Sequence, residues 1–197
     1  MNRRKKLPKI LEKEEIEKLL DTFNTRYPTN QRDKLMIQLM LDTGLRLPEV
    51  INLKWEYVNL TSGKIEVIEG KGAKDRIVYA NEKVLEKLKS WRDRQLKELN
   101  KRDIKNTEYV FTSLTGNKLD SGNIRRKIYK KTEKAGINKK VSPHTFRHTF
   151  ATDLYKETKN IRMVQKALGH ADISTTMIYT HIVDDDLADA MVNFRED

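Results

Sequence analysis

The spacing of apolar residues follows the helical period along most of this chain and changes only once. Side chains that recur every three to four positions predict helices over residues 11–23, 31–42, 48–53, 81–99, 120–136, 161–168 and 173–180, and another that opens at Ser142–Pro143. In contrast, Lys64–Ile68 and Arg76–Tyr79 are rich in β-branched residues and flank a glycine-containing turn, which is typical of an antiparallel hairpin. The sequence therefore predicts a mainly α fold with one small antiparallel β-sheet (α+β).

The organisation of the chain is that of one domain with two short ends. Residues 1–10 form a basic arm, residues 11–182 form the domain, and residues 183–197 form a tail whose acidic start is followed by apolar residues at helical spacing. Within the domain, Pro28 and Asn30 indicate a loop after the first helix, and Gly44 is placed to end the second.

The charge balance favours a polyanionic partner. The 197 residues include 40 Lys and Arg against 29 Asp and Glu, a formal net charge of +11, which attracts nucleic acid or an anionic membrane surface. No apolar run approaches the roughly 20 residues that span a bilayer, and the basic start has no signal-type apolar region. We therefore expect a cytoplasmic protein. Because the chain has no cysteine, disulfides, thiolate metal ligands and cysteine nucleophiles are excluded.

The late part of the chain carries side chains suited to attack on a phosphodiester. His144 and Arg147 are three positions apart and share a helix face, and His170 and Tyr179 follow. These residues offer a cation for a phosphate, imidazoles for proton transfer and a phenol that can act as a nucleophile. His144 and His148 also have a zinc-ligand spacing, but the segment lacks the glutamate of the zinc-protease motif, so a metal site is disfavoured.

Each of these late residues also has a purely structural interpretation. Tyr179 can be a half-buried packing residue, as most tyrosines are, with Ile173, Met177 and Thr180 forming a buried stripe and the phenol facing elsewhere. His170 can simply end a helix after Gly169.

An arginine and a glutamate mark the break between the second and third predicted helices. Arg46 at a helix entrance can bind a phosphate through its planar fork, and Glu49 can hold that fork in place. The alternative is an exposed ion pair that contributes at most about 1 kcal/mol.

The hairpin turn and one helix present further basic residues. The turn lacks the spacing of a nucleotide-binding loop, so ATP binding is poorly supported. Its tip can instead be inserted against DNA, with Lys71 as a proton donor, or it can be a solvated charged turn. The residues that we expect to contact DNA are Lys74, Arg76, Arg125, Arg126 and Lys130.

The order of these motifs resembles the tyrosine recombinase (phage integrase) family from about residue 10 to residue 182. The motifs are Thr-Gly-Leu-Arg-x-x-Glu at 43–49, Gly-Lys-Gly-x-Lys-x-Arg at 70–76, His-x-x-Arg-His-Thr-Phe-Ala-Thr at 144–152, Leu-Gly-His at 168–170 and Tyr-Thr-His at 179–181. The resemblance implies the catalytic domain fold of that family and site-specific cleavage and rejoining of DNA through a 3′-phosphotyrosyl intermediate.

The resemblance also implies a role for each site residue. Tyr179 would be the nucleophile, Arg46 and Arg147 would hold the phosphate oxygens, and Lys71 would protonate the leaving 5′-oxygen. His144 and His170 would assist proton transfer, with Glu49 in support. The phosphotyrosine conserves the bond energy, so neither a metal ion nor another cofactor is required. The implied partners are double-stranded DNA and other copies of the chain, as a tetramer on DNA and a monomer when free.

The chain departs from the family pattern in three places. Pro48 and Glu12 replace a small residue and a helix-capping threonine, and neither substitution touches the chemistry. The helical DNA-clamping domain that usually precedes this region is absent, so the chain is either a part of a longer recombinase or a short natural one. Two other functions stay open, a type IB topoisomerase and a DNA-binding regulator without catalysis.

Overall fold

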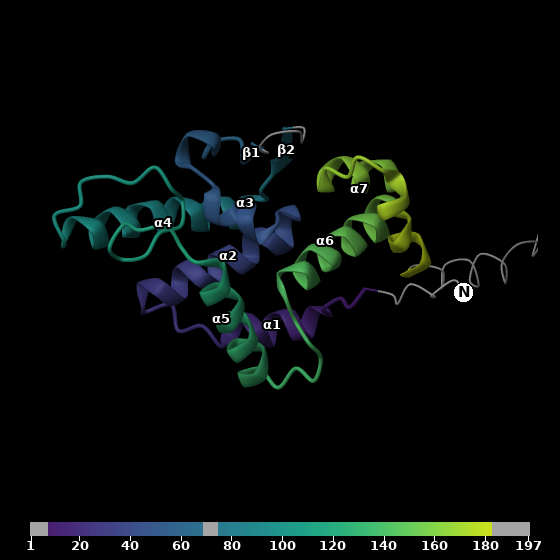
Figure 1. Cartoon of the computed structure of the whole chain (residues 1–197), viewed down its shortest axis with the longest axis horizontal. Coiled ribbons are helices and arrows are strands. Elements are labelled where there is room, and N and C mark those ends of the chain that lie inside the picture. The colour runs from purple at the N-terminus through teal and green to yellow at the C-terminus, as the bar shows by residue number, and fades with distance from the viewer. Residues whose placement is uncertain (1–7, 69–74, 183–197) are drawn as a thin grey trace, which may run out of the picture.

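The computed structural model describes residues 8–68 and 75–182, which form a mainly helical domain (Figure 1). Its first half contains helices α1 (Lys13–Asp21), α2 (Pro28–Thr43) and α3 (Leu47–Asn52), the 3₁₀ turn η1 (Trp55–Tyr57), and strands β1 (Lys64–Val67) and β2 (Arg76–Tyr79). Its second half contains helices α4 (Glu82–Asn100), α5 (Ser121–Lys134), α6 (Pro143–Thr158) and α7 (Ile161–Leu168), followed by the 3₁₀ segments η2 (Ile173–Thr175) and η3 (Met177–Ile182). The predicted class is confirmed.

The two strands pair in the register that their alternating pattern requires. They are antiparallel, with Ile65 opposite Val78 and Val67 opposite Arg76. Ile65 and Val78 face the core, whereas Ile77 and Tyr79 on the other face of the sheet are exposed. Arg76 shares the buried face of β2, a position that most strands give to an apolar residue.

Helix α2 is the centre of the main core. It packs against α4 and α6, and the side chains of Met36, Leu39 and Met40 are fully buried. Proline begins this helix at Pro28, where the sequence predicted a loop, because the fixed proline backbone suits a first helical turn. Gly44 ends it in the left-handed conformation with φ of 67°, as predicted.

A second, smaller apolar cluster lies beyond the main core. It joins the last turns of α6 to α7 and η3 through Ala151, Val164, Leu168 and Tyr179. Figure 1 shows α7 on the outer side of α6, and α7 also contacts β2. Residues that are distant in sequence, at the ends of α2, β2 and α7, therefore meet between the two clusters.

The predicted helix over 173–180 is instead two 3₁₀ segments, and this changes which side chains are buried. Thr176, which lies between the two segments, and Tyr179 in the second one are both buried. Met177, which the helical period placed on a buried stripe, is 43% exposed.

No helix within the described ranges is both long and apolar enough to cross a membrane.

Candidate active site

Arg46 and Glu49 form one side of the candidate site, at the junction of α2 and α3. The left-handed Gly44 turns the chain out of α2, and Arg46 then precedes the first residue of α3. The Glu49 carboxylate accepts a hydrogen bond from the Arg46 backbone N–H at 2.7 Å and another from Arg46 Nη1 at 2.8 Å. Since the Glu49 side chain is only 11% exposed, this is not the solvated ion pair of the alternative interpretation.

Arg147 forms the opposite side and is held by backbone carbonyls. It lies in the second turn of α6 and is buried. Its Nη1 donates to the Gly44 carbonyl at 2.6 Å and its Nη2 donates to the Leu168 carbonyl at 2.5 Å. Burial, together with the nearby positive charge of Arg46, lowers the pKa of Arg147 to about 10, so the side chain stays protonated at neutral pH.

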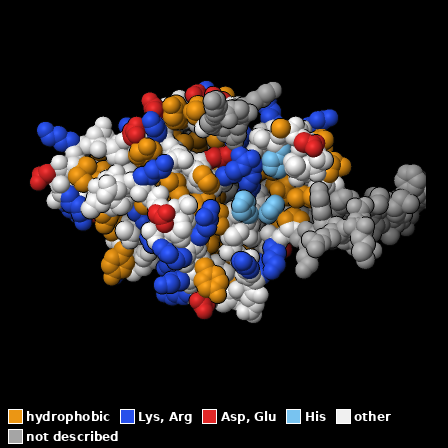
Figure 2. Space-filling view, viewed as in Figure 1, with side chains coloured by type: hydrophobic (Ala, Val, Ile, Leu, Met, Phe, Trp, Pro, Cys, Tyr) orange, Lys and Arg blue, Asp and Glu red, His pale blue; other side chains and the backbone are white. Residues whose placement is uncertain are grey.

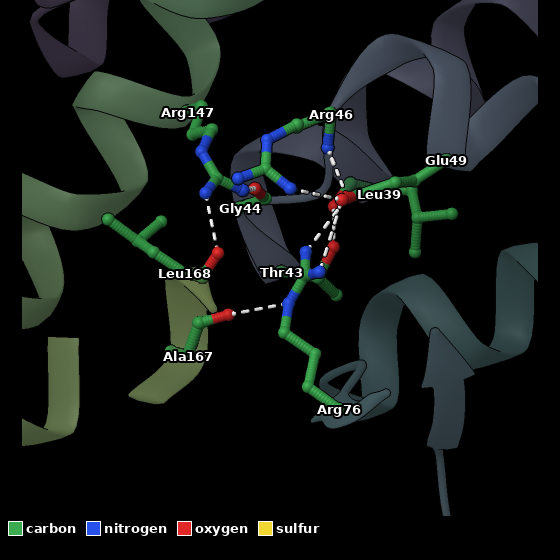
Figure 3. Close-up of polar contacts among 9 residues, drawn as sticks. All are labelled: Leu39, Thr43, Gly44, Arg46, Glu49, Arg76, Arg147, Ala167 and Leu168. Atoms are coloured by element: carbon green, nitrogen blue, oxygen red, sulfur yellow. Dashed lines mark hydrogen bonds and ion pairs between the residues drawn. The ribbon is translucent and has the colours of Figure 1, made fainter. Parts of the chain in front are cut away.

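The two guanidinium groups lie next to each other. Figure 3 shows Arg46 and Arg147 converging beside the Gly44 carbonyl, with the Glu49 carboxylate between Arg46 and Arg76. Two like charges at such proximity repel one another unless an anion compensates them. Glu49 compensates the charge of Arg46 within the protein, and the planar guanidinium forks of the pair match the geometry of phosphate oxygens.

Arg76 lies at this site and not on a surface that faces solvent. Its Nη1 and Nη2 donate to the two Glu49 carboxylate oxygens at 3.1 Å and 2.8 Å, and its Nε donates to the Ala167 carbonyl at 3.2 Å. The side chain is 7% exposed. The sequence predicts that Arg76 contacts DNA, whereas strand alternation turns this side chain toward the core rather than outward.

The histidines occupy different environments. His144 is exposed in the first turn of α6. His170 follows the helix-ending Gly169, and its Nδ1 lies 3.0 Å from the buried Thr176 hydroxyl. Burial and the charges of Arg147, Arg46 and Arg76 lower the pKa of His170 to about 4. His170 is therefore neutral at pH 7 in this state and can accept or donate a hydrogen bond as an uncharged ring.

Tyr179 is buried in η3 and is paired with His148. The side chain is 1% exposed, and a hydrogen bond of 2.8 Å joins its hydroxyl to His148 Nδ1. Burial raises the pKa of Tyr179 to about 12, although Arg147 acts in the opposite direction. His148 is the site residue that sequence reasoning missed. Its position directly after Arg147 was visible, but no sequence signal paired it with Tyr179.

The model of the phage integrase family matches residues 9–185 of the chain. The chain belongs to the phage integrase family. The tyrosine recombinase XerD of Staphylococcus saprophyticus is 40% identical to this family member over 178 residues, which cover 90% of the chain and 59% of that protein. XerD of Staphylococcus aureus (strain N315) has the same identity and coverage.

Solved structures of family members have the same fold. The XerA recombinase superposes with a TM-score of 0.80 at 35% identity and covers 97% of this chain and 66% of its own. XerH bound to a palindromic difH substrate, in a post-cleavage complex, superposes with a TM-score of 0.77 at 32% identity and covers 97% of this chain and 54% of its own. The chain thus spans 59% of the length of the XerD relatives that it matches.

This integrase-family domain carries its exposed basic residues partly on α5. Arg125, Arg126 and Lys130 are exposed, and Arg126 and Lys130 line a groove of about 660 Å³ together with Lys118 and Lys127. Figure 2 shows this basic surface on the same face of the molecule as the histidines.

The remaining predicted residues, Lys71 and Lys74, lie outside the described residues. Within the described part, no three side chains of His, Asp or Glu gather to hold a metal ion.

Proposed function

We propose that the chain cleaves and rejoins DNA strands at specific sites through a 3′-phosphotyrosyl intermediate. The observation that carries this proposal is the pair of guanidinium groups, Arg46 and Arg147, held side by side by Glu49 and by two backbone carbonyls. His170 follows the end of α7, where the Leu168 carbonyl accepts a hydrogen bond from Arg147. Tyr179 belongs to the same apolar cluster as Leu168. Such a site suits a phosphate that gains negative charge during reaction.

The proposed chemical step assigns one role to each of the predicted residues. The Tyr179 oxygen attacks the phosphorus, and the bond from phosphorus to the 5′-oxygen breaks. The phenolic proton passes to a base, for which His144 and His170 are the candidates, and Lys71 returns a proton to the leaving 5′-oxygen. Arg46 and Arg147 stabilise the non-bridging oxygens in the transition state, where the loss of one such donor costs about 3 to 4 kcal/mol. Attack by a 5′-hydroxyl on the phosphotyrosine reverses the step and rejoins the strand.

In this structure the Tyr179 hydroxyl is not positioned to attack a phosphate. The Tyr179 hydroxyl is bonded to His148, and its side chain is 1% exposed. The phenol must leave this pocket before it can reach a phosphate that is bound by the two arginines. Because η3 is a short 3₁₀ segment with few backbone hydrogen bonds to break, its displacement is inexpensive relative to that of a long helix.

The substrate of this reaction is double-stranded DNA. XerH, a 32% identical relative, has been solved bound to its difH substrate in a post-cleavage complex. Here Arg125, Arg126 and Lys130 on α5 would grip the phosphate backbone beside the site, while base contacts and DNA shape select the sequence. Recombination would join two sites in a tetramer in the cytoplasm, with the free chain as a monomer and residues 183–197 exchanged between neighbours.

A covalent trap tests the function. The probe is a library of DNA duplexes with a randomised region and a nick a few nucleotides 3′ of it, so that the short 5′-hydroxyl fragment leaves and the covalent product accumulates. The wild-type chain should yield protein-linked DNA under denaturing conditions, and sequencing of that DNA identifies the site. Tyr179→Phe should abolish the product but retain DNA binding. Tyr155→Phe, which removes a hydroxyl from the same apolar cluster, is the matched control and should still form the product.

Three outcomes distinguish the alternatives. Covalent product from Tyr179→Phe would exclude Tyr179 as the nucleophile. Relaxation of any supercoiled plasmid without dependence on sequence would indicate a type IB topoisomerase. Salt-dependent binding with no covalent product from the wild-type chain would indicate a DNA-binding regulator without catalysis.

A further inference from the structure

Arg76 occupies a position where a charged side chain is costly. It is the first residue of β2 and shares the buried face of that strand with Val78. A guanidinium removed from water must be matched by well-placed acceptors, because its desolvation is otherwise strongly unfavourable. With only 7% of its side chain exposed, Arg76 depends on the groups around it.

Those groups are a carboxylate and the end of a helix. The two terminal nitrogens of Arg76 bond the two Glu49 oxygens at 3.1 Å and 2.8 Å, which is the fork-to-fork geometry that arginine makes and lysine cannot. On its other side Glu49 accepts two hydrogen bonds from Arg46. The carboxylate thus stands between two guanidinium groups, of which one faces the phosphate site and the other is buried (Figure 3).

The end of α7 is held by the same side chain. Arg76 Nε donates to the Ala167 carbonyl, and Arg147 donates to the next carbonyl, that of Leu168. The last carbonyls of a helix lack partners within the helix and carry partial negative charge, so two arginines are well suited to them. Gly169 then passes directly over Arg76: a Cβ atom at this glycine would lie 2.8 Å from Arg76 Cδ. His170 is the next residue.

We propose that Arg76 is a positioning residue for strand cleavage. Through Glu49 it fixes the orientation of Arg46, and through the end of α7 it sets the position of His170. It does not contact DNA, since its guanidinium is buried against Glu49 and Ala167. This inference rests on the proposed function. It adds a residue that positions Arg46 and His170 without contacting the phosphate itself.

The test separates cleavage from binding. The substrate is the site recovered from the nicked library, and two quantities are measured: the single-turnover rate of covalent product formation at saturating protein, and the slope of log K for DNA binding against log salt. Arg76→Gln should lower the rate at least tenfold and leave the slope unchanged. Arg125→Gln, which removes an exposed cation, should reduce the slope by about 0.9. Arg102→Gln removes an arginine paired with Glu98 at the end of α4, and should change neither quantity.

Two further variants show how Arg76 acts. Arg76→Lys keeps the charge but not the fork, so its rate should lie between those of wild type and Arg76→Gln. It also supplies the comparison if Arg76→Gln fails to fold. In the double variant Glu49→Gln with Arg76→Gln, the loss of rate should be smaller than the product of the two single losses, because both changes interrupt the connection to Arg46 and only Arg76→Gln also releases the end of α7.

Three results would overturn the inference. A slope that falls by about 0.9 in Arg76→Gln would make Arg76 a phosphate contact. An unchanged rate in both Arg76 variants would remove the positioning role, and losses that multiply in the double variant would show that Arg76 does not act through Glu49. A wild-type chain that forms no covalent product would instead contradict the proposed function itself.

Discussion

The Nδ1 atom of His148 lies 2.8 Å from the hydroxyl oxygen of Tyr179, and this partly buried contact adjoins the small apolar cluster that contains Tyr179. The two residues are thirty-one positions apart in the sequence. The contact holds the proposed nucleophile in a retracted position with a raised pKa.

The first prediction concerns the energy of this contact. His148→Phe, Tyr179→Phe and the double variant should show a coupling of about 0.5 to 1.5 kcal/mol in the free energy of unfolding, measured by urea denaturation, as expected for an intramolecular hydrogen bond. The matched control combines His148→Phe with Tyr155→Phe, for which the effects should add. Additive effects for His148 and Tyr179 would mean that the bond is not formed in solution.

The second prediction concerns pH. The pKa of His170 falls from 6.5 in the unfolded chain to about 4 in the folded one, so the folded state prefers the neutral ring. The unfolded chain therefore binds more protons between these values, and stability should rise as the pH increases from about 4 to 6.5. The contribution of His170 to the free energy of unfolding is complete above about pH 6.5 and is lost as the pH falls toward 4. His148, whose pKa burial also lowers, acts in the same direction.

The measurement compares wild type with His170→Gln. The free energy of unfolding is followed from pH 4 to pH 8, and the difference between the two proteins isolates His170 from the carboxylates that titrate nearby. The variant should show a shallower rise below pH 6.5. Parallel curves would show that His170 is not buried beside the arginines as described.

The third prediction concerns Gly169 and its approach to Arg76. Gly169 and Gly136 have almost the same backbone conformation, with φ of 68° and 67°, but an added Cβ would lie 2.8 Å from Arg76 at the first and would meet nothing within 4 Å at the second. Gly136→Ala should therefore cost only the left-handed strain of about 1 to 2 kcal/mol. Gly169→Ala should destabilise the protein further and slow cleavage. Equal losses of stability for the two variants would exclude the contact.

The fourth prediction concerns Arg147. Arg147→Lys keeps a positive charge but cannot reach both the Gly44 and the Leu168 carbonyls, which would leave buried acceptors without a donor. Cleavage should fall by about 10²-fold or more, as expected for the loss of a preorganised donor. The rate of covalent product formation measures this. A loss below threefold would show that Arg147 does not bind the reacting phosphate.

The fifth prediction concerns the tail, residues 183–197, which lies outside the described residues. Its apolar residues at helical spacing suggest a segment exchanged between subunits, so deletion of the tail should spare cleavage more than recombination. Covalent trapping and a two-site recombination assay measure the two activities. Equal losses in both assays would contradict the exchange.

Local patterns predicted most of the elements correctly. The β-branched run around Ile77 gave a strand, and Gly44 ended a helix, because each depends on backbone preferences within a few residues. The predictions failed where two local rules compete. Pro28 suits a loop and a first helical turn equally well, and the segment around Met177 follows a period of three that is close to the helical one.

The sequence by itself determined the types of group at the site and their order along the chain. It showed that a basic, cysteine-free domain carries two arginines, several histidines and a tyrosine in the family arrangement, because these facts are local. Only the tertiary structure decided that Arg76 turns inward to Glu49 and that Tyr179 is held by His148. Both contacts join segments far apart in sequence, and long-range packing between the two apolar clusters decides which of them form.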